Sequence, residues 1–162
     1  MVSFSEVQST YVDFPNQVQS LMLSTVTPEG QPQASYTPFV MGRDRTFYIF
    51  VSGLSSHTQN LQKTPQAGIL LIEDETQTKQ IFARRRLMYD CAVNLIERHD
   101  PQWTGLADRF KQRFGNLIEM LRQLPDFQIF QLLPQGGRFV VGFGAAYEIN
   151  PENLEQLMPI EN

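Results

Sequence analysis

Residues 46 to 61, TFYIFVSGLSSHTQNL, join an apolar run directly to a polar segment that carries no formal charge. The first part, TFYIFV (46–51), consists of aromatic and β-branched residues, a composition that favours a buried β-strand. The second part, SGLSSHTQNL (52–61), gathers hydroxyl, imidazole and amide groups where that strand ends. The stretch therefore predicts a core strand whose end either caps a helix or holds an oxygen-rich ligand.

A short helix is expected over residues 55–63, because the polar segment runs into Pro65, which a helix interior does not accommodate. Ser55 or Ser56 would act as the N-cap by accepting a hydrogen bond from a first-turn N–H group. The same helix start could instead bind phosphate, since its free N–H groups carry partial positive charge and His57 adds a donor. The residue types alone favour the cap, and both interpretations use the same geometry.

Two further strands with tight turns precede this stretch. The strand-forming runs 21–27, 33–41 and 46–51 are separated by turn signals at PEG (28–30) and GRDR (42–45). Strands that follow each other so closely predict an antiparallel meander.

The rest of the chain adds strands and a few helices. They are a helix over 3–12 with Ser3 as N-cap, a buried strand over 66–73, a long strand over 80–97, a helical segment over 101–123 broken near Gly115, and strands over 126–134 and 137–149 joined by a QGG turn. About seven strands in hairpin order do not match an alternating βαβ pattern. The fold class is therefore expected to be mainly β (α+β), an antiparallel barrel with flanking helices. Residues 1–149 would form one domain, followed by a polar tail over 150–162.

Three consecutive arginines occur in the predicted long strand, within FARRRLMYDC (82–91). In an extended strand Arg84 and Arg86 point to the same face. Two guanidinium groups on one face repel each other unless an anion lies near them, and arginine suits the bidentate capture of phosphate or carboxylate. The competing interpretation pairs them with the acidic run Glu73–Asp74–Glu75, as surface charges usually do.

Composition argues against several classes of protein. A formal charge of −4 argues against a general nucleic-acid binder, which needs a basic surface. The one cysteine, Cys91, cannot form an intrachain disulfide and fits a reducing compartment. The N-terminal sequence has no secretory pattern, and no apolar run is long enough to span a membrane, so a cytoplasmic protein is expected. Two isolated histidines, His57 and His99, without a Cys/His cluster predict no metal site.

The order of these segments resembles the FMN-binding split barrels of the pyridoxamine 5'-phosphate oxidase-like superfamily. The similarity runs through LMLSTVTPEGQPQASYTPFV, TFYIFVSGLSSHTQNL, PQAGILLIE and the arginine-bearing strand, roughly residues 17–97. In that superfamily a strand ends in a segment of the form S-x-K-x-x-x-L. The matching residues in this chain are Ser55, Ser56, His57 (in place of the lysine) and Leu61.

A closer resemblance is to the haem-utilisation, haem-degrading branch of that superfamily. LLIEDE (70–75), FARRRLMYD (82–90) and GRFVVGFGAAYEI (137–149) are similar to signatures of that branch. In the branch a histidine past the last strand ligates haem, whereas this sequence has no histidine after His99. The flavin interpretation depends on the barrel and not on this tail.

The resemblance implies a Greek-key split barrel and a homodimer with two cofactor sites at its interface. The residues that would contact FMN by matched position are Ser55, Ser56, His57, Arg84 and Arg86 around the phosphate, and Ser35, Tyr36, Val51 and Ser52 along the ribityl chain and ring. It also implies a flavin-dependent oxidoreductase of unknown small-molecule substrate, in which the cofactor supplies the redox chemistry. The alternatives are a haem-binding or haem-degrading protein on the same barrel and a non-enzymatic ligand-binding module. No residue is assigned as a catalytic acid, a base or a metal ligand.

Overall fold

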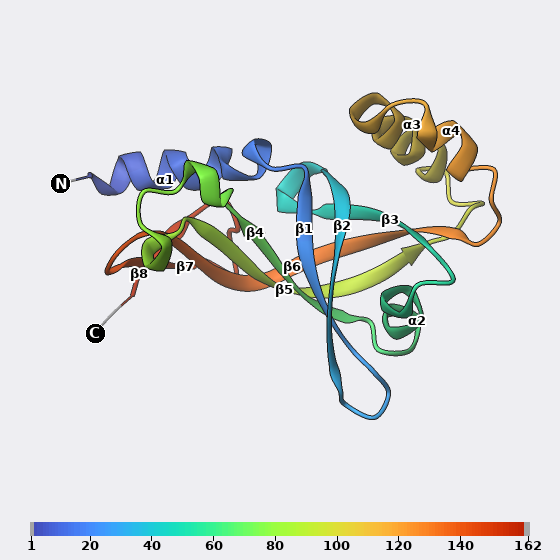
Figure 1. Ribbon diagram of the computed structural model, residues 1–162, viewed down its shortest axis with the longest axis horizontal. Helices are drawn as coiled ribbons and strands as arrows, with labels where there is room; N and C mark the ends of the chain where they lie inside the picture. Colours follow the sequence, from blue (N-terminus) through green and yellow to red (C-terminus); the bar gives the residue numbers. More distant parts are fainter. Residues whose placement is uncertain (1, 161–162) are drawn as a thin grey trace.

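The computed structural model describes residues 2–160 (Figure 1). In chain order the elements are α1 (Phe4–Asp13), η1 (Phe14–Gln17), β1 (Ser20–Val26), β2 (Pro32–Met41), η2 (Arg43–Arg45), β3 (Phe47–Ser52), α2 (Ser56–Lys63), β4 (Gln66–Ile72), η3 (Glu75–Gln77), η4 (Ile81–Ala83), β5 (Arg86–Ile96), α3 (Trp103–Phe114), α4 (Leu117–Leu121), β6 (Phe127–Gly142), β7 (Ala145–Ile149) and β8 (Leu157–Pro159), where η denotes a short 3-10 turn.

Strands β1 to β6 form a closed antiparallel barrel. They are hydrogen-bonded in the order β3-β2-β1-β4-β5-β6, and β3 pairs with β6 to close the ring. Strand β6 is long enough to leave the barrel: its first half pairs with β3, and its second half pairs with β7, to which β8 is added. The predicted fold class, a mainly antiparallel barrel with flanking helices, is confirmed. The predicted meander of β1, β2 and β3 is confirmed too.

Two hydrophobic cores meet at β3. Phe47, Ile49 and Val51 pack into the core inside the barrel. Tyr48 and Phe50 pack on the opposite side, where α3 and α4 cover the barrel wall (Figure 1). Because side chains alternate along a strand, burial of both faces requires an unbroken apolar run, which is what the TFYIFV stretch supplies.

A buried arginine ties both ends of the chain to the barrel. Arg45 is 2% exposed. Its Nε donates to the Tyr89 hydroxyl (3.0 Å), and its Nη1 and Nη2 donate to the carbonyl oxygens of Val12 (3.0 Å) and Tyr11 (3.2 Å) in α1. The Tyr11 hydroxyl contacts that of Tyr89 and donates to the Leu154 carbonyl, just before β8. A guanidinium is tolerated in a core when its donors are used in this way. Burial raises the pKa of both phenols, so the network stays neutral apart from Arg45.

Local helix signals are confirmed at two places. Ser3 caps α1 in a capping box: its Oγ accepts from the Glu6 backbone N–H (3.3 Å), and the Glu6 carboxylate accepts from the Ser3 backbone N–H (2.6 Å). The predicted break near Gly115 separates α3 from α4, where this residue has a φ of 89°, a conformation that favours glycine.

The predicted start of the long strand is wrong. Strand β5 begins at Arg86 rather than at residue 80, because residues 81–83 form η4. Gln80 stabilises that turn through its side-chain oxygen, which accepts from the Phe82 backbone N–H (3.3 Å). The predicted strand faces apply only from Arg86 onward.

The predicted QGG turn is also wrong. Strand β6 runs from Phe127 to Gly142 without a break, and the chain reverses at Phe143 and Gly144. A glycine is needed at position 137 for another reason: a Cβ there would lie 2.0 Å from the Met88 carbonyl oxygen of β5. This glycine permits a close approach of two strands.

The segment that follows β7 returns to the sheet as β8. Gln8 of α1 holds it by donating to the Glu155 carbonyl (2.6 Å) and accepting from the Leu157 backbone N–H (2.9 Å). Leu157 itself is buried in the barrel core. Within residues 2–160, no helix has the length and apolar character to cross a membrane.

We predict that Gly137→Ala destabilises the fold by about 3 kcal/mol or more, because the added methyl group collides with the Met88 carbonyl unless β5 and β6 separate. Gly136→Ala is the matched control, since a Cβ at this neighbouring position meets nothing within 4 Å. Urea unfolding followed by circular dichroism measures both variants. Equal unfolding midpoints would contradict the close approach.

Candidate functional site

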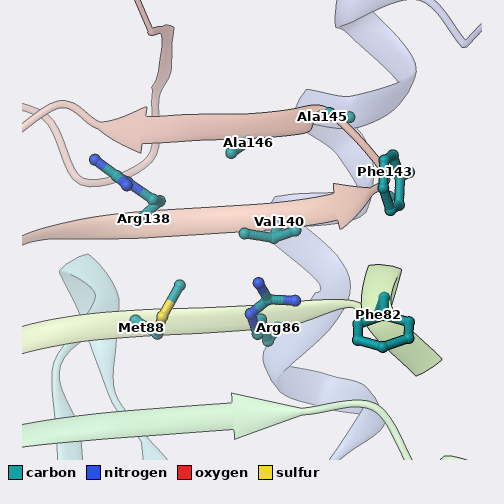
Figure 2. Close-up of a pocket in the computed structure, with 10 residues that line it drawn as sticks. Phe82, Arg86, Met88, Arg138, Val140, Phe143, Ala145 and Ala146 are labelled. Carbon is teal, nitrogen blue, oxygen red and sulfur yellow. The ribbon is translucent and has the colours of Figure 1, made fainter.

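A cleft of about 550 Å³ lies over the part of the sheet where β5, β6 and β7 are neighbours (Figure 2). We call it the β5–β7 cleft, and its volume is typical of small-molecule sites. The residues that line it are Phe82, Arg86, Met88, Arg138, Val140, Gly142, Phe143, Gly144, Ala145 and Ala146. Its lining is therefore apolar apart from two arginines.

Two exposed phenylalanines stand at one end of this cleft. Phe82 of η4 and Phe143 of the β6–β7 turn are 82% and 85% exposed, and Figure 2 shows their rings at the same end of the strands. Gly144 has a φ of 70° in this turn, which lets the chain reverse directly after Phe143. Large apolar side chains gathered in the open are typical of a surface that binds a ligand or a partner.

Two arginines supply the positive charge of the cleft. Arg86 on β5 is opposite Val140, and Arg138 on β6 is opposite Met88, so the guanidinium groups come from diagonal positions of neighbouring strands (Figure 2). Arg86 Nη1 donates to the Arg84 carbonyl (2.9 Å), which leaves its other donors for a ligand. Arg138 Nη2 lies 3.5 Å from Glu148, in an exposed pair that contributes little.

The start of α2 brings together some of the residues predicted to hold FMN. His57 Nδ1 and Ser35 Oγ are 2.9 Å apart and hydrogen-bonded, which joins α2 to β2. Tyr36, next along β2, is 62% exposed, whereas Val51 at the end of β3 is buried. Ser52 donates to the Asp126 carboxylate (2.8 Å) and accepts from a backbone N–H (3.2 Å).

The predicted hydroxyl cap of α2 is wrong. Ser55 is the N-cap residue, but its side chain makes no capping hydrogen bond, and Ser56 is already the first helical residue. The other polar side chains of the segment join the helix to the strands instead. Thr58 Oγ1 donates to the Ser52 carbonyl (2.6 Å), and the buried Asn60 amide donates to Thr25 (3.0 Å) and to Gln33 (2.8 Å). Much of the polarity of SGLSSHTQNL is therefore structural.

Arg84 does not share a strand face with Arg86, in contrast to the prediction. It lies at the end of η4, before β5 begins, because the chain turns there instead of extending. Its Nε donates to the Glu73 carbonyl (2.5 Å), and its Nη1 pairs with Glu75 (3.2 Å). The competing prediction, a pairing with the acidic run 73–75, is thus confirmed for Arg84.

Within one chain, Arg86 is far from the start of α2. His57 at the start of α2 is bonded to Ser35 on β2, whereas Arg86 is on β5, and strands β1 and β4 lie between β2 and β5. Three strand spacings put Ser35 and Arg86 roughly 15 Å apart, and Figure 1 shows α2 and β7 well apart in the molecule. A single chain therefore does not place both groups of predicted residues around one ligand.

Comparison with known proteins identifies the family. Residues 7–141 match the model of the pyridoxamine 5'-phosphate oxidase family. The chain belongs to this family.

Two relatives are similar to most of this chain, and one of them is named as a haem protein. The chain is 38% identical over 149 residues to the heme oxygenase HutZ of Vibrio cholerae serotype O1, which covers 92% of this chain and 84% of HutZ. The crystal structure of HutZ, described as a heme storage protein, superposes with a TM-score of 0.77 over 88% of this chain and 97% of that one. ChuZ of Campylobacter jejuni is 29% identical with a TM-score of 0.86, and this chain spans 64% of it. The resemblance to the haem-utilisation branch is confirmed.

Sequence reasoning about site residues missed Phe82, Met88, Arg138 and Phe143. A bulky residue between two glycines, as in Gly142-Phe143-Gly144, indicates an exposed turn. This signal is missed because the sequence pattern predicts the turn at QGG (135–137) and assigns residues 137–149 to one strand. Arg138 and Met88 become neighbours only through the register of β5 and β6, which the sequence alone does not give.

We predict that the His57 imidazole binds its proton more weakly in the folded chain than in the unfolded chain, because partial burial lowers its pKa below the usual 6.5. The unfolded chain then binds more protons in this range, so the free energy of unfolding rises with pH. Acidification from about pH 7 to pH 5 should therefore destabilise the protein, and His57→Gln should reduce that slope.

Urea unfolding at several pH values measures this effect, with His99→Gln as the control because His99 is exposed on the surface. Identical pH slopes in the parent protein and in His57→Gln would contradict the prediction.

Proposed function

We propose that this protein binds haem in the β5–β7 cleft and serves haem utilisation in the cytoplasm. The observation that carries the proposal is the combination in one cleft of apolar walls, two exposed aromatic rings and two arginines, with no acidic residue among the lining. The heme oxygenase HutZ, which is similar in sequence and fold, supports the same conclusion.

The lining residues fit the chemistry of haem. A porphyrin is a large, flat apolar ring with two carboxylate side chains. Phe82 and Phe143 offer faces for the ring, and Met88 and Val140 offer an apolar surface beneath it. Arg86 and Arg138 are the groups that would bind the two carboxylates, because a guanidinium pairs with a carboxylate through two parallel hydrogen bonds.

The cleft residues bind and orient the group rather than transfer protons. Bound haem would supply iron, whose reactivity towards oxygen depends on its axial ligands. Met88 is the lining residue whose side chain can ligate iron, through its thioether sulfur. The cleft lining contains no imidazole, so the residues of the cleft support haem binding and not a specific degradation step.

We further propose a homodimer that packs through the outer face of the barrel. An open, almost wholly apolar depression of about 410 Å³ lies there, and its outward-facing side chains include Met22, Ala34, Leu70 and Met88. Met22 is 47% exposed. A second copy would cover this face with the same residues across a two-fold axis. Because Met88 lines this depression and the β5–β7 cleft, the partner would also border the cleft.

FMN is a second candidate ligand, and the start of α2 favours it. The Ser55 side chain makes no capping hydrogen bond, so its hydroxyl and the first-turn N–H groups are available to a phosphate. His57 and Ser35 already lie together beside this helix start. In the proposed dimer, the separation between this group and Arg86 within one chain would be bridged by residues of the second copy.

We predict that titrating haem into the purified protein produces a saturable shift of the Soret band. Arg86→Gln and Arg138→Gln should each weaken binding roughly tenfold, because each removes a charged hydrogen bond to a carboxylate. Lys79→Gln is the matched control, as it removes an equal charge from an exposed residue outside the lining.

Absence of a saturable Soret shift would reject haem binding. Equal losses in the control and in the arginine variants would reject the cleft as the site. Quenching of FMN fluorescence, measured in parallel, tests the second candidate independently.

We predict that the purified protein is a dimer and that Met22→Glu converts it to a folded monomer, because a carboxylate at this position would be buried without a partner. Leu117→Glu on α4 is the control: it is 57% exposed and lies outside the proposed interface. Light scattering measures the mass, and circular dichroism checks the fold. A monomeric parent protein, or a Met22→Glu variant that is still dimeric, would contradict the interface.

A further inference from the structure

A second, smaller cavity lies between α3, the end of β2 and η1. Its volume is about 260 Å³, and the residues that line it are Asn16, Val40, Met41, Arg109, Gln112 and Arg113. Four of these six side chains end in N–H donors, and none is acidic. The cavity shares no residue with the β5–β7 cleft, and Figure 1 shows α3 and β7 far apart in the molecule.

Two arginines on one face of α3 give this cavity its charge. Arg109 and Arg113 are four residues apart, so they are neighbours on the helix surface and repel each other. Among residues 2–160, neither forms a salt bridge with a carboxylate. The nearby Asp13 is not part of the lining, and its two carboxylate oxygens accept from Asn16 and Gln17.

Both guanidinium groups are held in place by the backbone. Arg113 donates to the Phe39 carbonyl (2.9 Å) and the Val18 carbonyl (2.7 Å), and its guanidinium lies 4.8 Å from the centre of the Phe39 ring. Arg109 donates to the Met41 carbonyl. Burial lowers the pKa of Arg113, because no opposite charge offsets the loss of water around it. The side chains are thus ordered before any ligand arrives, which reduces the entropic cost of binding.

Several donors around the cavity are left over after these contacts. A guanidinium has five N–H donors, of which Arg113 uses two and Arg109 uses one on the carbonyls named above. The Gln112 amide adds two more. Spare N–H donors, two positive charges and no acidic residue in the lining are the composition that an oxyanion site requires.

We propose that this cavity between α3 and β2 binds a small oxyanion, a phosphate or a carboxylate group. The volume suits a small anion or the charged end of a larger molecule, since drug-sized ligands occupy roughly 300 to 1,000 Å³. The bound anion would relieve the repulsion between Arg109 and Arg113 and join α3 more firmly to the barrel. The site is independent of the proposed haem cleft, because its residues come from different elements.

The test is a titration of the full chain with inorganic phosphate at constant ionic strength, followed by ¹⁵N NMR of the arginine side chains and by thermal unfolding. We expect saturable shifts of the Arg109 and Arg113 Nε–H signals and a rise in melting temperature that chloride does not reproduce. A parallel titration with acetate decides between phosphate and carboxylate as the preferred group.

Arg109→Gln should weaken phosphate binding roughly tenfold, because it removes a charged donor while Arg113 keeps its backbone contacts. Arg43→Gln is the matched control, since Arg43 lies outside the lining. Gln112→Ala, on an exposed helical position, weakens binding without a change of charge and without a risk to folding. Shifts that grow linearly with anion concentration, or equal losses in Arg109→Gln and Arg43→Gln, would overturn the proposal.

Discussion

The pairing of β3 with β6 closes the barrel, and the rest of the structure depends on it. Strand β3 separates two cores, so its side chains are buried on both faces. Each large apolar side chain removed from water in this way contributes on the order of 1.5–3 kcal/mol. Strand β3 therefore has few alternative positions in the fold, because exposing either of its faces would leave aromatic rings in solvent. Its partner β6 is fixed with it, since a slip of one residue would turn every side chain to the wrong face.

The cleft exists because β6 continues beyond the barrel. Beyond β3 the same strand pairs with β7, and this extension places Arg138 and Val140 beside β5, with Phe143 in the turn that follows. The pairing of β5 with β6 is irregular between Asp90 and Cys91, and the tight contact at Gly137 lies close to this irregularity. Strands β5, β6 and β7 together provide seven of the ten residues that line the cleft, which favours a fixed arrangement of its charged groups.

The sequence predicts those features that depend on neighbouring residues. The strand over 46–51, the meander, the N-cap at Ser3 and the helix break at Gly115 all follow from local composition and are present in the structure. Features that depend on distant residues are not predictable in this way. The sequence around Gly137 is typical of a turn. The structure requires glycine there for a different reason, because a Cβ would collide with the carbonyl oxygen of Met88 on β5. The sequence pattern predicts that Arg84 lies in a strand, whereas its contacts with Glu73 and Glu75 hold it in a turn.

The network around Arg45 means that the two ends of the chain are not independent. One guanidinium binds the carbonyls of α1, and the Tyr11 hydroxyl reaches from α1 to the carbonyl just before β8. Loosening of the segment before β8 removes an acceptor from Tyr11, and loosening of α1 removes two acceptors from Arg45. Because an unmatched buried cation is costly, the first and last elements should open together as one cooperative unit. Amide hydrogen exchange in α1 and in β8 would then report a single opening event, although almost the entire sequence lies between them.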